Sequence, residues 1–168
     1  MKYLSIDPAT ATGKKQAYAS FEDRKIVSRG RCTLDEVQDL IKGHDVIFCE
    51  DQYIAFPKGG RSRIWRAKAQ SIISLAHSVG QIERMAKFED KEFYYVDPGT
   101  WQARVLGVRP GTKAHAREQA AVKIARMYIK THLGKEESEK RMGVDIGCAV
   151  CIGICGIGER EYNKLKLR

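Results

Sequence analysis

The chain has 168 residues, 43% of them hydrophobic, which suits one folded domain with a core of its own. Lys and Arg number 30 against 21 Asp and Glu, so the formal charge is +9, which favours a polyanionic partner, nucleic acid before an anionic membrane surface. The first residues turn polar too early for a signal peptide, and five cysteines without framework spacing argue against disulfides, so we expect a protein of the reducing cytoplasm.

Two strands within the first fifty residues are expected to end in a carboxylate. Residues 2–7 alternate and stop before Pro8, which predicts a strand with Asp7 at its C-terminal end. The apolar run 45–50, bounded by polar residues, predicts a buried strand that ends in Glu50. Between them we expect a hairpin of residues 17–21 and 25–30, and a short helix at 34–41 behind a capping box of Thr33 and Glu36.

A basic segment, residues 53–68, follows Glu50. Five Lys and Arg residues stand there among three aromatic residues, with two glycines and without any acid. Such a mixture suits phosphate contacts and base stacking, so we expect a loop that binds nucleic acid; a solvated flexible loop is the alternative. The residues concerned are Tyr53, Phe56, Lys58, Arg61, Arg63, Trp65, Arg66 and Lys68.

The remainder of the chain is expected to form helices and one more strand. Apolar residues at helical spacing predict a long helix from 67 to 88, and residues 92–96 predict a strand that an Asp-Pro-Gly sequence ends. This order of elements, without linkers or repeats, predicts a single domain over residues 1–168. Further helices are expected at 100–106, at 113–133 and within 141–160.

Residues 141–160 read RMGVDIGCAVCIGICGIGER and allow three interpretations. A membrane span needs about 20 apolar residues, whereas the uncharged run 146–158 has 13. A metal–thiolate site has suitable spacing at Cys148 and Cys151, but a strong zinc site needs four ligands, and only three cysteines stand here. The third interpretation is a helix packed on a sheet.

The packed helix explains more of this segment than the other two. At 3.6 residues per turn Asp145 stands at the head of one stripe, where the positive end of the helix dipole favours its ionised form. Glycines cost helix propensity, so we expect them to allow a close approach to the sheet. The stripe consists of Asp145, Cys148, Ile152 and Cys155, with Cys151 beside it, and the glycines are Gly147, Gly153 and Gly156.

Three acids thus share a pattern. Asp7 and Glu50 end strands, and Asp145 begins a helix that covers a sheet. Because groups at the carboxyl ends of strands converge at one edge, the three would repel one another unless a divalent cation neutralised them. Oxygen ligands of this kind suit Mg²⁺ or Mn²⁺. Each acid alone is typical of a solvated strand end or helix cap, but together, on a basic chain, they predict the site of a metal-dependent nuclease.

Five segments, in this order, resemble the motifs of one family. They are LSIDPATATG (4–13), IFCEDQYI (47–54), VDPGTWQARVLG (96–107), GTKAHAREQAA (111–121) and VDIGCAVCIGI (144–154). The set is similar to that of the RuvC-type Holliday junction resolvases of the RNase H-like superfamily, in the divergent form common in phages. The resemblance covers most of the chain and implies an α/β fold, with a mixed five-stranded sheet flanked by helices on both faces.

The resemblance also implies roles for single residues. Asp7, Glu50 and Asp145 would hold two Mg²⁺ or Mn²⁺ ions. Tyr53 would stack on bases at the centre of the junction, and Lys113 would contact phosphates of the scissile region.

The sequence departs from the family pattern near its last acid. The family has a further ligand, Asp or His, three residues before that acid, and here this position is Met142. Glu139 is a candidate to reach the metal from the preceding turn, or three carboxylates suffice. A smaller departure is Ala9, which replaces the usual Gly after Asp-Pro.

The implied activity is that of a crossover junction endonuclease in DNA recombination and repair. It would nick four-way junctions in pairs and leave 5′-phosphate and 3′-hydroxyl ends by a two-metal displacement. A homodimer would set two sites on opposing strands, with the helix at 67–88 as the candidate interface. Two rivals stay open: a broader nuclease that debranches forks and flaps and, because of Met142, a catalytically weak protein that binds DNA structures.

Overall fold

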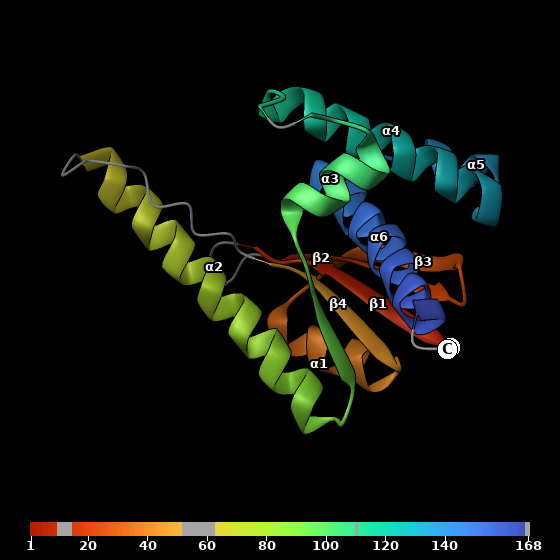
Figure 1. The fold of residues 1–168 in the computed structure, drawn as a ribbon, viewed down its shortest axis with the longest axis horizontal. Helices are drawn as coiled ribbons and strands as arrows, with labels where there is room; N and C mark the ends of the chain where they lie inside the picture. The colour runs from red at the N-terminus through yellow and green to blue at the C-terminus, as the bar shows by residue number, and fades with distance from the viewer. Residues whose placement is uncertain (10–14, 52–62, 110, 167–168) are drawn as a thin grey trace.

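The structure, a computed structural model, describes residues 1–9, 15–51, 63–109 and 111–166; for 63–70 and 164–166 it describes the backbone alone. These residues form a five-stranded sheet of order β3-β2-β1-β4-β5 (Figure 1). The pairs β1–β2 and β2–β3 are antiparallel, whereas β1–β4 and β4–β5 are parallel, so the expected mixed sheet is confirmed. The strands are β1 (Lys2–Asp7), β2 (Gln16–Glu22), β3 (Lys25–Cys32), β4 (Val46–Glu50) and β5 (Glu92–Val96).

Helices cover both faces of this sheet, as expected. The helices α1 and α2 pack on one face, and α3, α4 and α6 lie over the other (Figure 1). The short helix α5 follows α4 and was not among the elements expected from the sequence. The bounds are α1 (Leu34–Lys42), α2 (Arg63–Phe88), α3 (Pro98–Leu106), α4 (Ala114–Leu133), α5 (Lys135–Glu139) and α6 (Val144–Lys166).

Several boundaries differ from the expectation. The helix α3 begins at Pro98, before residue 100, and α6 continues to Lys166, past residue 160. The helix α2 begins at Arg63, inside the segment expected to be a loop, because no Gly or Pro follows there and Arg, Ala and Lys favour a helix. The strand β3 continues past Gly30 to Cys32. Gly30 pairs with Tyr18 of β2. The tyrosine ring would lie 3.2 Å from a Cβ at residue 30, so the absence of a side chain there leaves room for the ring over the paired strands.

The helix α6 lies close on the middle of the sheet. A Cβ at Gly153 would overlap the ring of Phe21, and one at Gly156 would overlap the ring of Phe48. Both glycines therefore allow this approach, which confirms the expected role of small residues here. The buried hydroxyl of Ser5 on β1 adds a hydrogen bond to a main-chain carbonyl of α6, at 2.7 Å.

Gly147 meets a helix instead of the sheet. A Cβ there would lie 3.2 Å from the backbone of Val122, so α4 and α6 cross closely at this point. All three glycines were expected to face the sheet; Gly147 differs because α4 covers the first turn of α6.

The cysteines of α6 are mainly packing residues. Cys151 and Cys155 are buried in the core, and burial raises the pKa of the first thiol to about 12 and of the second to about 11. Such thiols stay protonated, which does not suit a metal–thiolate site. In the parts of the chain described, no helix has both the length and the apolar character needed to cross a bilayer.

Candidate active site

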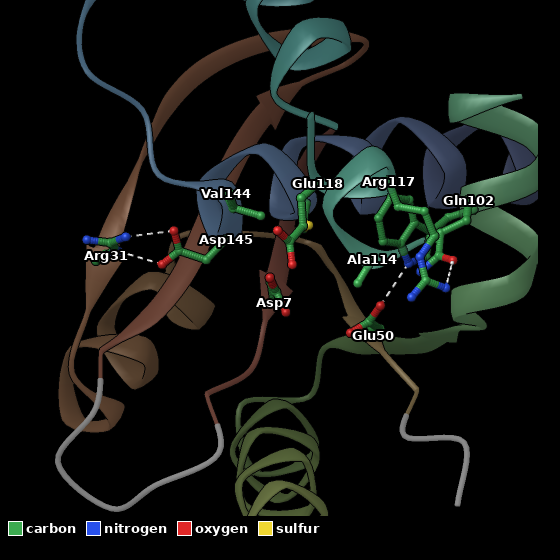
Figure 2. A pocket seen from close by; sticks show the side chains of 11 residues that line it. Asp7, Arg31, Glu50, Gln102, Ala114, Arg117, Glu118, Val144 and Asp145 are labelled. Atoms are coloured by element: carbon green, nitrogen blue, oxygen red, sulfur yellow. Dashed lines mark hydrogen bonds and ion pairs between the residues drawn. The ribbon is translucent and has the colours of Figure 1, made fainter. Parts of the chain in front are cut away.

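A cavity of about 500 Å³ opens where the carboxyl ends of β1 and β4 meet the start of α6. Its lining includes the three acids expected from the sequence, Asp7, Glu50 and Asp145, together with a fourth, Glu118 of α4 (Figure 2). Two guanidinium groups, those of Arg31 and Arg117, also line it. The fold thus brings the three predicted acids to one cavity.

The alternation of the strands explains why two of the acids face the same side. On β1, Tyr3 and Ser5 point toward α6, so Asp7 does so as well. On β4, Phe48 belongs to the same core face, so Glu50 shares it. The strands are parallel neighbours in a register that pairs the residues just before the two acids, which places Asp7 beside Glu50.

Of the three acids expected from the sequence, Asp7 has the least support from its surroundings. Within the described part of the chain no hydrogen bond or ion pair reaches its carboxylate. Burial raises its pKa well above the ordinary value, and the charges of Glu50 and Asp145 raise it further. A proton or a cation is therefore needed to balance this group.

Glu50 is held by a tryptophan. The indole N–H of Trp101 donates a hydrogen bond to Oε1 of Glu50 at 2.9 Å. Trp101 is buried on α3, a helix that Asp97 caps by accepting from the backbone N–H of Thr100 at 2.6 Å. A core residue thus orients one carboxylate of the cavity.

Asp145 is paired with an arginine of β3. The guanidinium of Arg31 donates to both carboxylate oxygens, from Nε to Oδ2 at 2.5 Å and from Nη2 to Oδ1 at 2.7 Å (Figure 2). This hydrogen-bonded pair lowers the pKa of Asp145, so the group stays ionised at neutral pH.

The sheet register places Arg31 at the site. Asp7 pairs with Ala17 on β2, and Ala17 pairs with Arg31 on β3, so the three side chains leave the same face in one row. The buried Ala17 is small enough to leave a path between its neighbours. Gly143 completes the approach, since a Cβ there would overlap both the guanidinium of Arg31 and the carboxylate of Asp145.

The donor set fits a hard divalent cation in its chemistry. Four carboxylates around one cavity supply the oxygen ligands that Mg²⁺ and Mn²⁺ prefer. As the described side chains stand, no three His, Cys, Asp or Glu residues lie close enough together to hold one ion. Asp145 is turned to Arg31 and Glu50 to Trp101, so a bound ion requires at least Asp145 to exchange its partner.

Other predicted residues lie away from the cavity. Lys113 is exposed just before α4 and is not among the lining residues, although the next residue, Ala114, is. Glu139 of α5 is exposed, lies 3.6 Å from the ammonium group of Lys135 and is likewise not part of the lining. Met142 packs against the core under α6.

The predicted DNA-binding segment falls largely outside the description. Tyr53, Phe56, Lys58 and Arg61 lie in residues that the structure does not describe. Arg63, Trp65, Arg66 and Lys68 belong to the first turns of α2, where the backbone alone is described.

Sequence reasoning missed four residues of the cavity: Arg31, Trp101, Arg117 and Glu118. For Glu118 a signal was present, because it is the one acid in the sequence of α4, a helix rich in Lys and Arg. Trp101 is a buried residue of the core, and nothing in the sequence indicates its hydrogen bond to Glu50.

No protein-family model matches the sequence, and no curated protein does either. The fold is similar to two solved structures of RuvC from Thermus thermophilus. One has a TM-score of 0.61 at 10% identity over 96% of this chain and 97% of that chain. The other, in complex with a Holliday junction substrate, has a TM-score of 0.57 at 12% identity over 96% of each chain. A yeast mitochondrial Holliday junction resolvase aligns at a TM-score of 0.45 and 14% identity, over 97% of this chain and 83% of its own. At identities of 10% and 12%, the likeness to the two RuvC structures shows a shared fold and no more, and this fold agrees with the α/β architecture expected from the resemblance.

Proposed function

We propose that this protein is a metal-dependent, structure-selective DNA endonuclease that resolves four-way (Holliday) junctions by paired nicks. The nicks would leave 5′-phosphate and 3′-hydroxyl ends. The observation that carries the proposal is the convergence of Asp7, Glu50 and Asp145 on one cavity at the carboxyl edge of β1 and β4. The RuvC-like fold of nearly the whole chain supports it.

Asp7, Glu50 and Asp145 would hold the divalent cations, two Mg²⁺ or Mn²⁺ ions. Such a pair supplies activation of a water nucleophile and charge stabilisation at the departing 3′ oxygen. The remaining work falls to the chain itself. Trp101 keeps Glu50 in one orientation, and Arg31 keeps Asp145 ionised until a cation takes its place.

Two positively charged side chains, those of Arg117 and Lys113, would act on the scissile phosphate. Arg117 lines the cavity, and its guanidinium donates to the side-chain oxygen of Gln102 at 3.1 Å, which fixes its direction. Lys113 stands one residue before the cavity-lining Ala114, so its flexible side chain is in position to contact the same phosphate. Positive groups at this point stabilise the charge that builds on the phosphate oxygens during displacement.

Affinity for branched DNA would come from the net charge of +9 and from the basic aromatic segment that follows Glu50. We assign junction binding to Tyr53, Phe56, Lys58, Arg61, Arg63, Trp65, Arg66, Lys68 and Lys113. The working form would be a homodimer with α2 at its interface, because two opposed strands need two sites. The five cysteines, all free, agree with a place in the cytoplasm.

Two alternatives share the same cavity. A broader debranching nuclease, cutting forks and flaps, would use the same carboxylates. A catalytically weak protein that binds DNA structures is favoured by one observation, the Arg31–Asp145 pair, which occupies both oxygens of a proposed metal ligand.

One cleavage experiment separates these functions. Labelled four-way, three-way, flap and linear duplex DNA are incubated with the protein in Mg²⁺ or in EDTA, beside Asp7→Asn. We expect paired symmetric nicks on the four-way junction alone, in Mg²⁺ alone, and none with Asp7→Asn. Equal cutting of flaps would favour the debranching nuclease, and binding without metal-dependent cleavage would favour the binding protein. Cleavage by Asp7→Asn would contradict the site.

A further inference from the structure

We infer that Glu118 of α4 supplies the fourth carboxylate of the metal site, in place of the ligand that the family pattern puts at Met142. The inference rests on the proposed function and adds to it a ligand from another element. It concerns Glu118 alone; the other three acids follow from the sequence.

The position of Glu118 is the first support. It lines the same cavity as Asp7, Glu50 and Asp145. In Figure 2 its carboxylate reaches down from α4 and is turned toward that of Asp7. The side chain is exposed, and the space to which it is exposed is this cavity.

The packing of two helices explains how α4 delivers this side chain. Gly147 lets α6 approach the backbone of Val122, and Glu118 stands one turn before Val122 on the same face of α4. The crossing therefore sets Glu118 above the first turn of α6, where Asp145 lies. Gly147 thus allows the close crossing of the two helices that brings Glu118 to the cavity.

Ordinary roles for a helical glutamate do not account for Glu118. It is the single acid of α4, and no Lys or Arg stands three or four residues away, where an ion pair along the helix would form. Among the described residues no hydrogen bond or ion pair to it occurs. Placed in the fifth position of the helix, it does not cap the helix N-terminus either.

The charge of the cavity is the second support. Four carboxyl groups face two guanidinium groups there, so two negative charges stay unmatched when all four are ionised, in a chain whose formal charge is +9. Asp7, partly buried at the end of β1, has no partner among the described residues. A DNA phosphate would be repelled from this place unless cations neutralised it. The excess of carboxyl groups in the cavity is therefore what a site for divalent cations requires.

Met142 does not take the ligand role. It precedes α6 and packs against the core with its thioether side chain. Glu139, the other candidate, is on α5 near Lys135 and outside the lining of the cavity. Of these three positions, Glu118 is the one in the cavity.

The test measures metal binding without DNA or turnover. The purified full chain is titrated with Mn²⁺, and free Mn²⁺ is counted by electron paramagnetic resonance, for wild type, Glu118→Gln and Glu139→Gln. The two variants make the same chemical change at the two candidate positions. We expect Glu118→Gln to weaken the less tightly held ion, or the single ion if one binds, by at least roughly tenfold. Glu139→Gln should bind as wild type does.

The outcomes are separable from those of the proposed function. If wild type binds Mn²⁺ and Glu118→Gln binds it equally well, the inference is overturned while the proposed function stands. If Glu139→Gln loses the ion instead, the fourth carboxylate is Glu139 and the inference is again wrong. If wild type binds no Mn²⁺, the proposed function itself fails. Thermal melting of each variant without metal checks that both fold as wild type does, which an exposed Glu→Gln change should allow.

Discussion

Arg31 holds both carboxylate oxygens of Asp145, at 2.5 and 2.7 Å, at the mouth of the candidate active site. A divalent cation on Asp145 must compete with this guanidinium. Because the interaction of two unit charges at about 4 Å is worth about 1 kcal/mol even at the dielectric constant of water, we expect Arg31→Gln to strengthen Mn²⁺ binding at least about fivefold. Calorimetric titration of the metal-free wild type and variant with Mn²⁺ measures this change in affinity.

Arg29→Gln is the matched control for Arg31. Arg29 lies on the same strand, but its partners are the side chain and the carbonyl of Glu137, away from the cavity. It should leave Mn²⁺ binding unchanged. Weaker binding by Arg31→Gln would mean that the guanidinium organises the site instead of competing with the ion.

The hydrogen bond from Trp101 to Glu50 should matter for catalysis beyond packing. Trp101→Phe keeps an aromatic ring and removes the N–H, so Glu50 loses a donor that orients it. We expect Mg²⁺-dependent junction cleavage to fall about 10–100-fold, the usual effect of losing a partner of a metal ligand. Ile129→Val, a change in the same buried cluster, controls for lost volume and should cleave as wild type does. Equal cleavage by the two variants would mean that Trp101 contributes packing alone and that its hydrogen bond to Glu50 does not matter for catalysis.

Asp7 should destabilise the metal-free protein at neutral pH. Its pKa is raised in the folded state by burial, so the stability it contributes is present below its ordinary value of 3.8 and is lost as pH rises through the raised value. Asp7→Asn cannot ionise, and in EDTA at pH 7 it should melt above wild type, by roughly 2–4 °C for each kcal/mol gained. The difference should vanish in acid. A melting temperature at or below that of wild type at pH 7 would contradict this balance.

Asp145 should behave with the opposite sign. Its hydrogen-bonded pair with Arg31 lowers the pKa, so its contribution is present above 3.8 and is lost as pH falls through the lowered value. Asp145→Asn in EDTA should therefore melt below wild type at pH 7. The loss is expected to be about 1 kcal/mol or less, because both side chains are partly exposed. Melting curves of both variants across pH 3 to 8 compare the two signs directly.

The glycines of α6 offer a test of the helix–sheet packing. Gly153→Ala would push a Cβ into the ring of Phe21, which overpacks a buried contact at a cost of about 1–3 kcal/mol. At Gly158 nothing lies within 4 Å of such a Cβ, so Gly158→Ala should instead stabilise the helix by about 0.5–1 kcal/mol. Chemical denaturation measures both. Equal effects of the two substitutions would exclude close packing at Gly153.

The acids of the strands could be predicted from the sequence because their signals are local. One strand pattern stops at Pro8 and another stops after Glu50, and each places a carboxylate at the end of a strand. Because side chains alternate between the two faces of a sheet, the pattern also indicates which face each carboxylate shares with the core residues of its strand. Asp145 was found in the same way, at the head of a helical stripe.

The roles of Arg31, Trp101 and Glu118 could not be predicted because they depend on pairings between distant segments, even though Glu118 stands out as the one acid of α4. Arg31 reaches the site through the register of three strands, and Glu118 through the crossing of α4 and α6 at Gly147. Spacing along the chain carries neither kind of information. The start of α2 at Arg63 was missed because charged residues that follow a pair of glycines are compatible with a loop as well as with a helix.

The four carboxylates come from β1, β4, α4 and α6, so the cavity is complete only when the last helix has docked. Because synthesis runs from the N-terminus, a ribosome releases Asp7 and Glu50 well before Asp145. A nascent chain that ends before α6 has the basic segment 53–68, which we propose to bind DNA, but lacks Asp145 of the proposed metal site. If the protein is the proposed nuclease, such an unfinished chain would bind DNA without being able to cut it.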